Sequence, residues 1–256
     1  NPGGALPAAV SMADLFLTEG EIVNIRSPRK DKTDRGRAFS ARPGNTFADL
    51  PVVVLINENS ASASEIVAGA LSDHGRAKVL GERSFGKGSV QELRPIEGDN
   101  GILKLTTKYY YLPSGRHLQR PKKLDDQLWG VDPSPGCVVP ESVVEARDRI
   151  RARRPFEAVG GTYVDVPDAV VEPWIVEKMK DAPLGEAVTL MRQRLERDAW
   201  PELPEDEDPG YISTMVQLEN LLKTRELIES QITEINDEIE RLEGLAETVD
   251  RGLGLE

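Results

Sequence analysis

The sequence predicts an α/β domain followed by one long helix. A continuous β-branched run at Pro51–Asn57 is typical of a strand that is buried on both faces of a parallel sheet. A helical pattern from Ser64 to Asp73 and a short apolar run at 77–82 follow it, and this order of strand, helix and strand indicates a right-handed crossover unit. Beyond an acidic segment at 201–210, apolar residues recur at heptad spacing.

Shorter elements flank this unit. The chain opens with a glycine turn and an amphipathic helix, then a short strand at 21–27. Residues 28–47 are polar and rich in glycine, arginine and proline, which predicts an exposed loop. A glycine-flanked loop at 84–93 runs into a strand, and the alternation of 101–113 predicts another. One face of that last strand would carry Leu103, Leu105, Thr107, Tyr109 and Tyr111.

The second half of the chain is expected to be irregular and then helical. Prolines and glycines at 113–140 predict an irregular loop, and helical patterns return at about 141–153 and 173–198. The acidic, proline-bounded segment 201–210 is the clearest domain boundary. We therefore expect a domain over residues 1–200, a linker over 201–210 and a coiled-coil-like helix over 211–256.

The last segment carries two heptad seams. The first seam is Leu218, Arg225, Ile232, Ile239 and Ala246, and the second is Leu221, Ile228, Ile235, Leu242 and Val249. Nine of these ten positions are apolar, and Arg225 is the exception. The pattern fits a helix that pairs with itself or docks on a partner, and it also fits a helix that folds back on its own domain.

Charge and composition exclude several classes. The net charge of the 256 residues is -12, and Glu202–Glu256 holds 16 acidic and 4 basic residues whereas the rest holds 28 of each. A nucleic-acid-binding protein needs a clustered positive face, so nucleic acid is not an expected partner. The basic run Arg147–Arg154 fits a solvated helix face. No apolar run is long enough to predict a membrane span.

The single cysteine, Cys137, excludes an internal disulfide and a thiolate metal cage, and no metal or cofactor is expected. The chain begins with NPGG and has neither an initial methionine nor a signal-like segment. This suggests a processed or excised piece of a longer protein.

Three serines alternate in the stretch NENSASASEI, at Ser60, Ser62 and Ser64. If one of these serines is a nucleophile, a base must take its proton. A histidine could do so only if it were His74 or His117, the two histidines of the chain. His74 would sit at the far end of the helix that starts beside the serines, and His117 fits a solvated loop histidine.

A lysine base is the remaining possibility. Lys87 lies between two glycines in SFGKGSVQEL, with no acid closer in sequence than Glu82 and Glu92. A lysine that takes a serine proton has to be uncharged, and burial away from acids favours that form. Gln91 follows by four residues, so on an extended segment its amide would share a face with the amine and could orient it.

These residues alone also permit a structural interpretation. A serine before EIVAGAL can cap a helix with help from Glu65 or Glu58, and glycine-flanked lysines are common in surface loops. The GKGS segment lacks the spacing of a phosphate-binding loop. Capping and catalysis therefore both remain open at this point.

The stretch NENSASASEIVAGALSDHGRAKVLGERSFGKGSVQ resembles the core of the carboxyl-terminal processing peptidases, or tail-specific proteases. NPGG, KYYYLPSGRHLQ, WGVDPSP and DAPLGEAVTLM also resemble family features in the family's order. In this family the middle serine of the alternating set lies 25 positions before the lysine, and a glutamine follows four residues later.

The resemblance implies Ser62 as nucleophile, Lys87 as general base and Gln91 as the residue that orients the lysine. It implies an oxyanion hole made by backbone amides of Ala63 and of Gly3 or Gly4. The base then takes the Ser62 proton, an acyl-enzyme forms, and water hydrolyses it. Ser60 would remain in the turn and Ser64 would cap the helix.

The implied fold is the crotonase-like or Clp-protease-like β-α spiral, and the implied location is the periplasm or cell envelope of a bacterium. Family members usually carry a PDZ domain upstream, so activity can depend on segments before Asn1. The stretch at about 121–173 is expected to be an insertion, and neither it nor the heptad helix is a general family feature.

The expected function is an endopeptidase that cuts proteins near their C-termini. The alternative is a non-catalytic peptide-binding or scaffold member of the same fold that assembles through its acidic helix. A hydratase or acyl-transfer enzyme of the crotonase class would need basic contacts to coenzyme A, and the sequence shows no sign of them.

Overall fold

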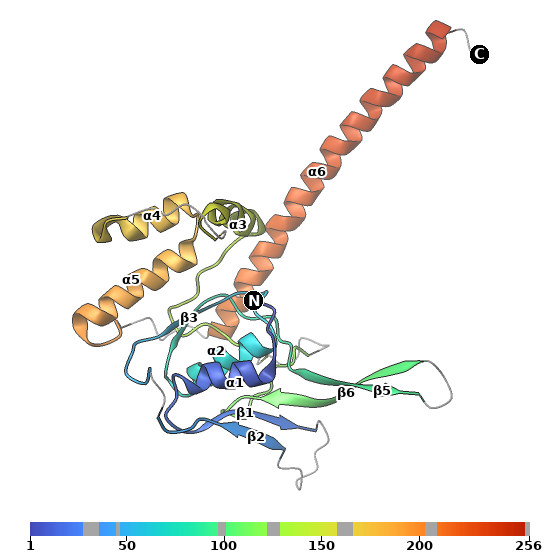
Figure 1. The fold of residues 1–256 in the computed structure, drawn as a ribbon. Helices are drawn as coiled ribbons and strands as arrows, with labels where there is room; N and C mark the ends of the chain where they lie inside the picture. The colour runs from blue at the N-terminus through green and yellow to red at the C-terminus, as the bar shows by residue number, and fades with distance from the viewer. Residues whose placement is uncertain are drawn as a thin grey trace.

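A computed structural model describes residues 1–27, 36–44, 47–96, 101–121, 129–157, 166–202 and 209–253. Strands and the first two helices form a central body, three shorter helices lie to one side of it, and one long helix projects from it (Figure 1). The α/β class expected from the sequence is confirmed.

The strands are β1 (Glu21–Arg26), β2 (Arg37–Ser40), β3 (Val53–Ile56), β4 (Lys78–Gly81), β5 (Ser89–Pro95) and β6 (Ile102–Tyr111). The helices are α1 (Leu6–Asp14), α2 (Ala63–Asp73), α3 (Val143–Glu157), α4 (Val171–Lys178), α5 (Ala182–Arg197) and α6 (Pro209–Leu253), with a 3-10 turn η1 at Asp168–Val170.

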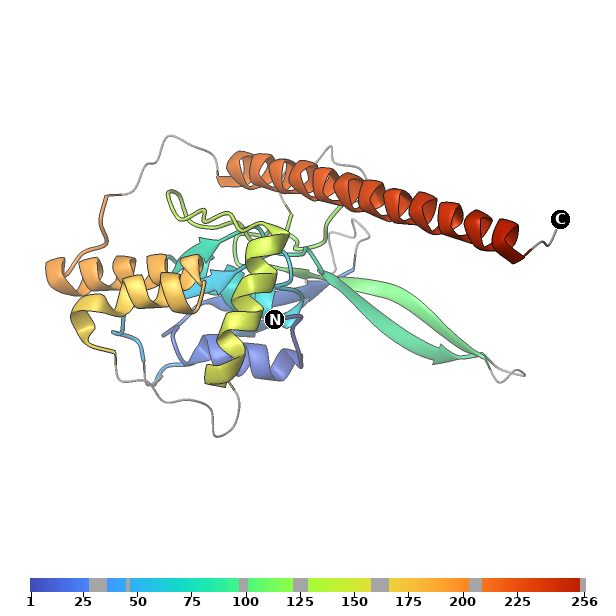
Figure 2. The same cartoon turned by 90° about the horizontal axis from the view of Figure 1, so that it is seen from above.

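Four strands form an antiparallel sheet in the order β2-β1-β6-β5. Its β5–β6 hairpin extends away from the body, as Figure 2 shows from above. The strand β2 was missed in the sequence, because its four residues lie inside the polar segment interpreted as a loop. It pairs only along the edge with β1, so its side chains carry little of the apolar pattern that reveals a strand.

The crossover unit is confirmed as strand, helix and parallel strand. Val53 to Ile56 of β3 pair in register with Lys78 to Gly81 of β4, and α2 connects the two. The expectation that β3 is buried on both faces is wrong: Leu55 is 41% exposed. It lines a cavity of about 390 Å³ that lies beside β3.

The main core lies between α1, α2 and the sheets. Helix α2 contributes most to it, because its small and apolar residues let it pack closely against strands and against α1. Fully buried members of this core include Ala13, Ile22, Ile66, Leu71 and Val79. This packing fixes the position of the start of α2, where the serines lie.

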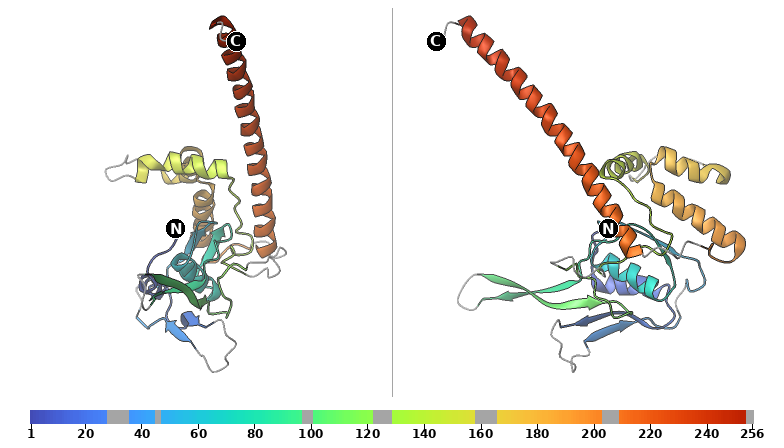
Figure 3. Two further views of the ribbon diagram at one scale, coloured as in Figure 1. Left: turned by 90° about the vertical axis from the view of Figure 1, so that its right-hand side faces the viewer. Right: turned by 180° about the vertical axis from the view of Figure 1, so that it is seen from behind.

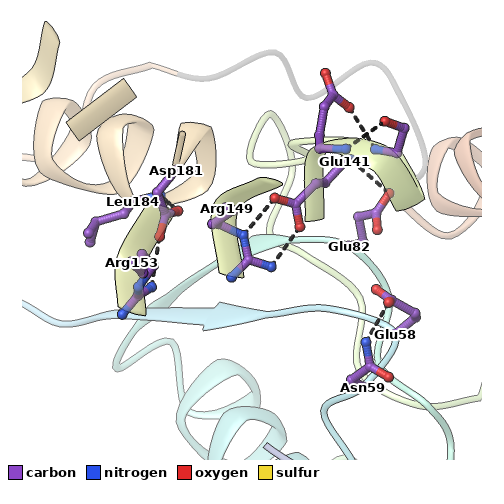
Figure 4. A network of polar contacts seen from close by, with 10 residues as sticks. Glu58, Asn59, Glu82, Glu141, Arg149, Arg153, Asp181 and Leu184 are labelled. Atoms are coloured by element: carbon purple, nitrogen blue, oxygen red, sulfur yellow. Dashed lines mark hydrogen bonds and ion pairs between the residues drawn. The ribbon is translucent and has the colours of Figure 1, made fainter. Parts of the chain in front are cut away.

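A partly buried network of ion pairs joins α3 to the segment before it and to α5 (Figure 4). Arg149 of α3 donates two hydrogen bonds to Glu141, at 2.6 and 2.7 Å, and this contact raises the pKa of Arg149. Arg153 donates to Asp181 at 2.7 Å, and the same carboxylate caps α5 by accepting from the backbone of Leu184.

The single helix expected at 173–198 is two helices in the structure. Helix α4 ends at Lys178, Lys180 takes a positive φ of 56°, and Asp181 starts α5. The proline at the start of α5 and the capping by Asp181 explain the break. A periodic pattern alone does not reveal it, because both helices keep the same apolar spacing.

Helix α6 leaves the body and extends well beyond it (Figure 3). Near its start, Thr214 accepts a hydrogen bond from the buried Arg83 at 3.2 Å. Most of the expected linker, 203–208, and parts of the expected insertion, 122–128 and 158–165, lie outside the described residues. Within the described helices, none combines the length and apolar character that crossing a bilayer requires.

Candidate active site

Ser62 stands at the sharp turn between β3 and α2. It is the N-cap of α2, and its backbone has φ 58° and ψ -116°. Few residues other than glycine adopt such a conformation, which costs about 1–3 kcal/mol and persists only where the surroundings hold it. A serine on a strained strand-to-helix turn is typical of an exposed nucleophile, with the positive end of the helix dipole nearby.

A buried carboxylate, that of Glu65, joins this turn to the lysine loop. Its Oε1 accepts from the Ser84 hydroxyl and from the backbone of Gly86, both at 2.6 Å. Its Oε2 accepts from the backbone of Ser62 at 2.7 Å and of Lys87 at 2.8 Å. Glu65 is fully buried, so four donors from two segments converge on one carboxylate away from water.

This arrangement brings Ser62 and Lys87 together. Their backbone nitrogens lie within about 5.5 Å of each other, since both bond the same Glu65 oxygen at 2.7 and 2.8 Å. Residues 25 positions apart in the sequence are thus neighbours at one end of α2. The linking role of Glu65 was not predicted from the sequence, where Glu65 was considered only as a residue that assists a helix cap. The Ser-x-x-Glu spacing, which is that of a capping box, was the available signal.

The N-terminal turn packs directly against the serine turn. The carbonyl oxygen of Asn1 accepts from the backbone of Ala61 at 3.1 Å and from the Ser64 hydroxyl at 2.8 Å. Gly3 has φ 96°, and a Cβ there would lie 2.5 Å from the Ala61 carbonyl oxygen and 3.0 Å from the Ser62 Cβ. Glycine is therefore required at position 3 by both backbone conformation and space.

Gly3→Ala is expected to lower the free energy of unfolding by about 2 kcal/mol, because it adds the strain of a positive φ to a backbone clash. Gly4→Ala is the matched control, since a Cβ on Gly4 meets nothing within 4 Å and its change should stay within about 0.5 kcal/mol. Urea unfolding of both variants checks this, and equal stabilities would contradict it.

The backbone amides of the glycine turn and of the start of α2 differ in whether they have hydrogen-bond partners. The amide of Gly3 donates to Asn1 Oδ1 at 3.0 Å. Among the described residues, no hydrogen bond occupies the amide of Gly4 or of Ala63, the first residue of α2. Unpaired donors at a helix N-terminus are suited to hold an oxyanion.

Lys87 and Gln91 differ from the sequence-based expectation. Lys87 is an exposed residue in the described structure, whereas the sequence-based argument requires burial. Lys87 lies before β5, and a bulge between Val90 and Gln91 breaks the alternation, so the argument from a shared strand face does not hold. No hydrogen bond in the described part of the chain joins Gln91 to Lys87.

The other two serines have structural contacts. Ser60 lies in the turn, as expected, and its hydroxyl accepts from the backbone of Asn57 at 3.1 Å. The expectation that Ser64 caps the helix is wrong, because Ser62 is the N-cap and the Ser64 hydroxyl bonds Asn1 instead. The N-cap therefore lies two residues earlier than expected, and α2 starts one residue earlier, at Ala63.

Both histidines contact residues other than the three serines. His74 is the C-cap of α2, at the end opposite the serine turn, and its Nε2 lies 2.7 Å from the Glu21 carbonyl oxygen. The ring of His117 packs near Tyr109 and Tyr111. Within the described residues, no group of three or more histidines, cysteines and acids could hold a metal ion.

Comparison with known proteins decides the family. The model of peptidase family S41 matches residues 1–133, which contain the glycine turn, the serine turn and the lysine loop. The chain belongs to peptidase family S41. The resemblance inferred from the sequence is therefore confirmed at the level of the family.

The matches to curated relatives cover a larger fraction of this chain than of the relatives. A carboxy-terminal-processing protease of Bartonella bacilliformis is 38% identical over 217 residues, covering 80% of this chain and 45% of the relative. A probable CtpA-like serine protease of Staphylococcus haemolyticus is 40% identical over 118 residues, covering 46% and 23%. The chain thus spans less than half the length of these two relatives.

Among solved structures, the photosystem II D1 C-terminal processing protease is similar, with 32% identity and a TM-score of 0.46. The matched region covers 54% of this S41 chain and 32% of that protein.

Proposed function

We propose that this chain is the catalytic part of a serine endopeptidase that cuts protein substrates near their C-termini. The observation that carries the proposal is the shared carboxylate of Glu65, which places the backbones of Ser62 and Lys87 side by side in a member of peptidase family S41. The name of the 38% identical relative, a carboxy-terminal-processing protease, supports the substrate class.

The proposed mechanism uses a serine–lysine pair. The Lys87 amine takes the proton of the Ser62 hydroxyl, and the serine oxygen attacks the substrate carbonyl. The amides of Ala63 and Gly4 stabilise the oxyanion; we favour Gly4 over Gly3 because Asn1 already occupies the Gly3 amide. Lys87 then protonates the leaving amine, and water hydrolyses the acyl-enzyme.

Exposure of Lys87 gives the substrate a role in this mechanism. An amine accepts a proton only when it is uncharged, and water favours the charged form. A bound polypeptide would cover the amine and remove that water. We propose Gln91 as a polar neighbour that orients the amine once the site is covered, and the bacterial cell envelope as the location.

Cleavage of a defined tail tests the proposal. The full-length protein should cut a substrate with an apolar C-terminal tail, and mass spectrometry should place the cut near the C-terminus. Lys104→Ala is a matched control for Lys87→Ala because Lys104 is also an exposed lysine. The proposal predicts that the native protein and the Lys104→Ala variant cleave the substrate and that the Lys87→Ala variant does not. Absence of cleavage by the native protein would favour the non-catalytic scaffold.

A further inference from the structure

Helix α6 presents an apolar stripe that no other described element covers. Seven seam residues are between 47 and 68% exposed: Leu218, Leu221, Ile228, Ile232, Ile235, Ile239 and Leu242. They follow one another at heptad spacing, so they lie on one side of the helix. An exposed apolar stripe of this length on a helix of 45 residues marks an interaction surface.

We propose that α6 pairs in an antiparallel coiled coil with α6 of a second copy of this chain. The heptad seam is symmetric about the point between Thr233 and Glu234, so reversing the helix brings one seam onto the other. In that register Ile232 faces Ile235 of the second copy, Ile228 faces Ile239, and Arg225 faces Leu242. In this single alignment each residue of the first seam faces a residue of the second seam in the other copy.

Charge along α6 favours the antiparallel direction. Residues 209–231 carry 3 acids and 2 bases, whereas residues 232–253 carry 7 acids and 2 bases. A parallel pair would place the two acidic halves together and Arg225 against Arg225. An antiparallel pair places each acidic half along the less acidic one.

The single charged seam residue fits the same direction. Arg225 is 65% exposed, with its guanidinium 3.5 Å from Glu229 of its own helix. Opposite it in the antiparallel register lies Leu242 of the second copy, flanked by the exposed Glu238 and Glu243. In coiled coils, opposite charges around a seam position favour one orientation of the two helices over the other.

The position of α6 in the molecule allows this pairing. The helix is attached to the body near Thr214 and projects away from it (Figure 1, Figure 3). In the proposed register Thr214 of one copy faces Leu253 of the other, so the two points of attachment are about 60 Å apart. The two bodies then lie at opposite ends of the coiled coil and do not compete for space.

Cysteine crosslinking in the full chain tests both the pairing and its direction. The variants Ile228→Cys and Ile239→Cys, carrying tags of different size, are oxidised singly and after co-expression. The native chain is the control: Cys137 is 3% exposed, and burial raises the pKa of its thiol, so it should not crosslink.

We expect a disulfide-linked species that contains one Ile228→Cys and one Ile239→Cys chain, and none from either variant alone. In an antiparallel pair, two copies of residue 228 are about 16 Å apart along the axis, too far for a disulfide. Crosslinking of each variant with itself would show a parallel pair and overturn the proposal.

Sedimentation of chains without introduced cysteines gives an independent result. The native chain should sediment as a dimer, and Arg225→Glu should raise its dissociation constant about tenfold, because it places a further acid beside Glu238 and Glu243. Asp237→Glu is the control, since Asp237 lies outside the seam and keeps its charge. A monomeric native chain at all concentrations would overturn the proposal.

Discussion

Ser62→Ala is expected to lower the turnover of peptide cleavage by at least about 10⁴-fold in the full-length protein. The loss should be large because the proposed mechanism makes this hydroxyl the attacking group, while the strained turn and the carboxylate of Glu65 remain. Lys87→Ala should cost a similar factor. The double variant should be little worse than either single variant, since nucleophile and base act as one unit.

Two further variants separate chemistry from folding. Ser62→Gly also removes the hydroxyl but fits the positive φ of 58°, so it should be inactive and at least as stable as Ser62→Ala. Ser11→Ala, on the exposed side of α1, should keep native turnover. Measured steady-state rates that fall in Ser64→Ala and persist in Ser62→Ala would contradict the assignment of the nucleophile.

Glu65→Ala is expected to lower the free energy of unfolding by about 3 to 5 kcal/mol. The substitution leaves the Ser84 hydroxyl and three backbone amides without their buried acceptor. It also releases the lysine loop from the serine turn, so activity should fall together with stability. Denaturant unfolding and a cleavage assay on the same sample measure both.

Controls distinguish this role from a general effect of charge. Glu65→Gln keeps the shape and one acceptor oxygen, so its loss of stability should lie between those of the native chain and Glu65→Ala. Glu58→Ala should change stability by less than about 0.5 kcal/mol, because Glu58 is exposed and bonds the neighbouring Asn59. Equal stability of Glu65→Ala and Glu58→Ala would show that the four hydrogen bonds do not hold the site.

The sequence was most informative where pattern and local chemistry agree. The apolar run before the serines, the small-residue helix after them and the heptad helix each have a residue pattern that identifies the element, although the run is less buried than expected. Ser62 and Lys87 could be chosen because their separation matches the family pattern. The strand β2 and the break at Lys180 escaped because edge pairing and local capping leave no periodic signal.

The contacts around the site could not be predicted in the same way. Glu65 bonds residues about twenty positions away, and such a partnership depends on how α2 packs against the lysine loop. The exposure of Lys87 depends on segments that meet in space. The bulge before Gln91 shifts the strand by one residue, which reverses the face that an alternating pattern would predict.

The most direct test of the central claim is covalent labelling of the full-length protein with a fluorophosphonate, which reacts with activated serines. Peptide mass spectrometry then identifies the labelled residue. We predict one adduct on Ser62, its absence in Ser62→Ala and its strong slowing in Lys87→Ala, with labelling unchanged in Lys104→Ala. An adduct on another serine, or equal labelling of Ser62 with and without Lys87, would contradict the account.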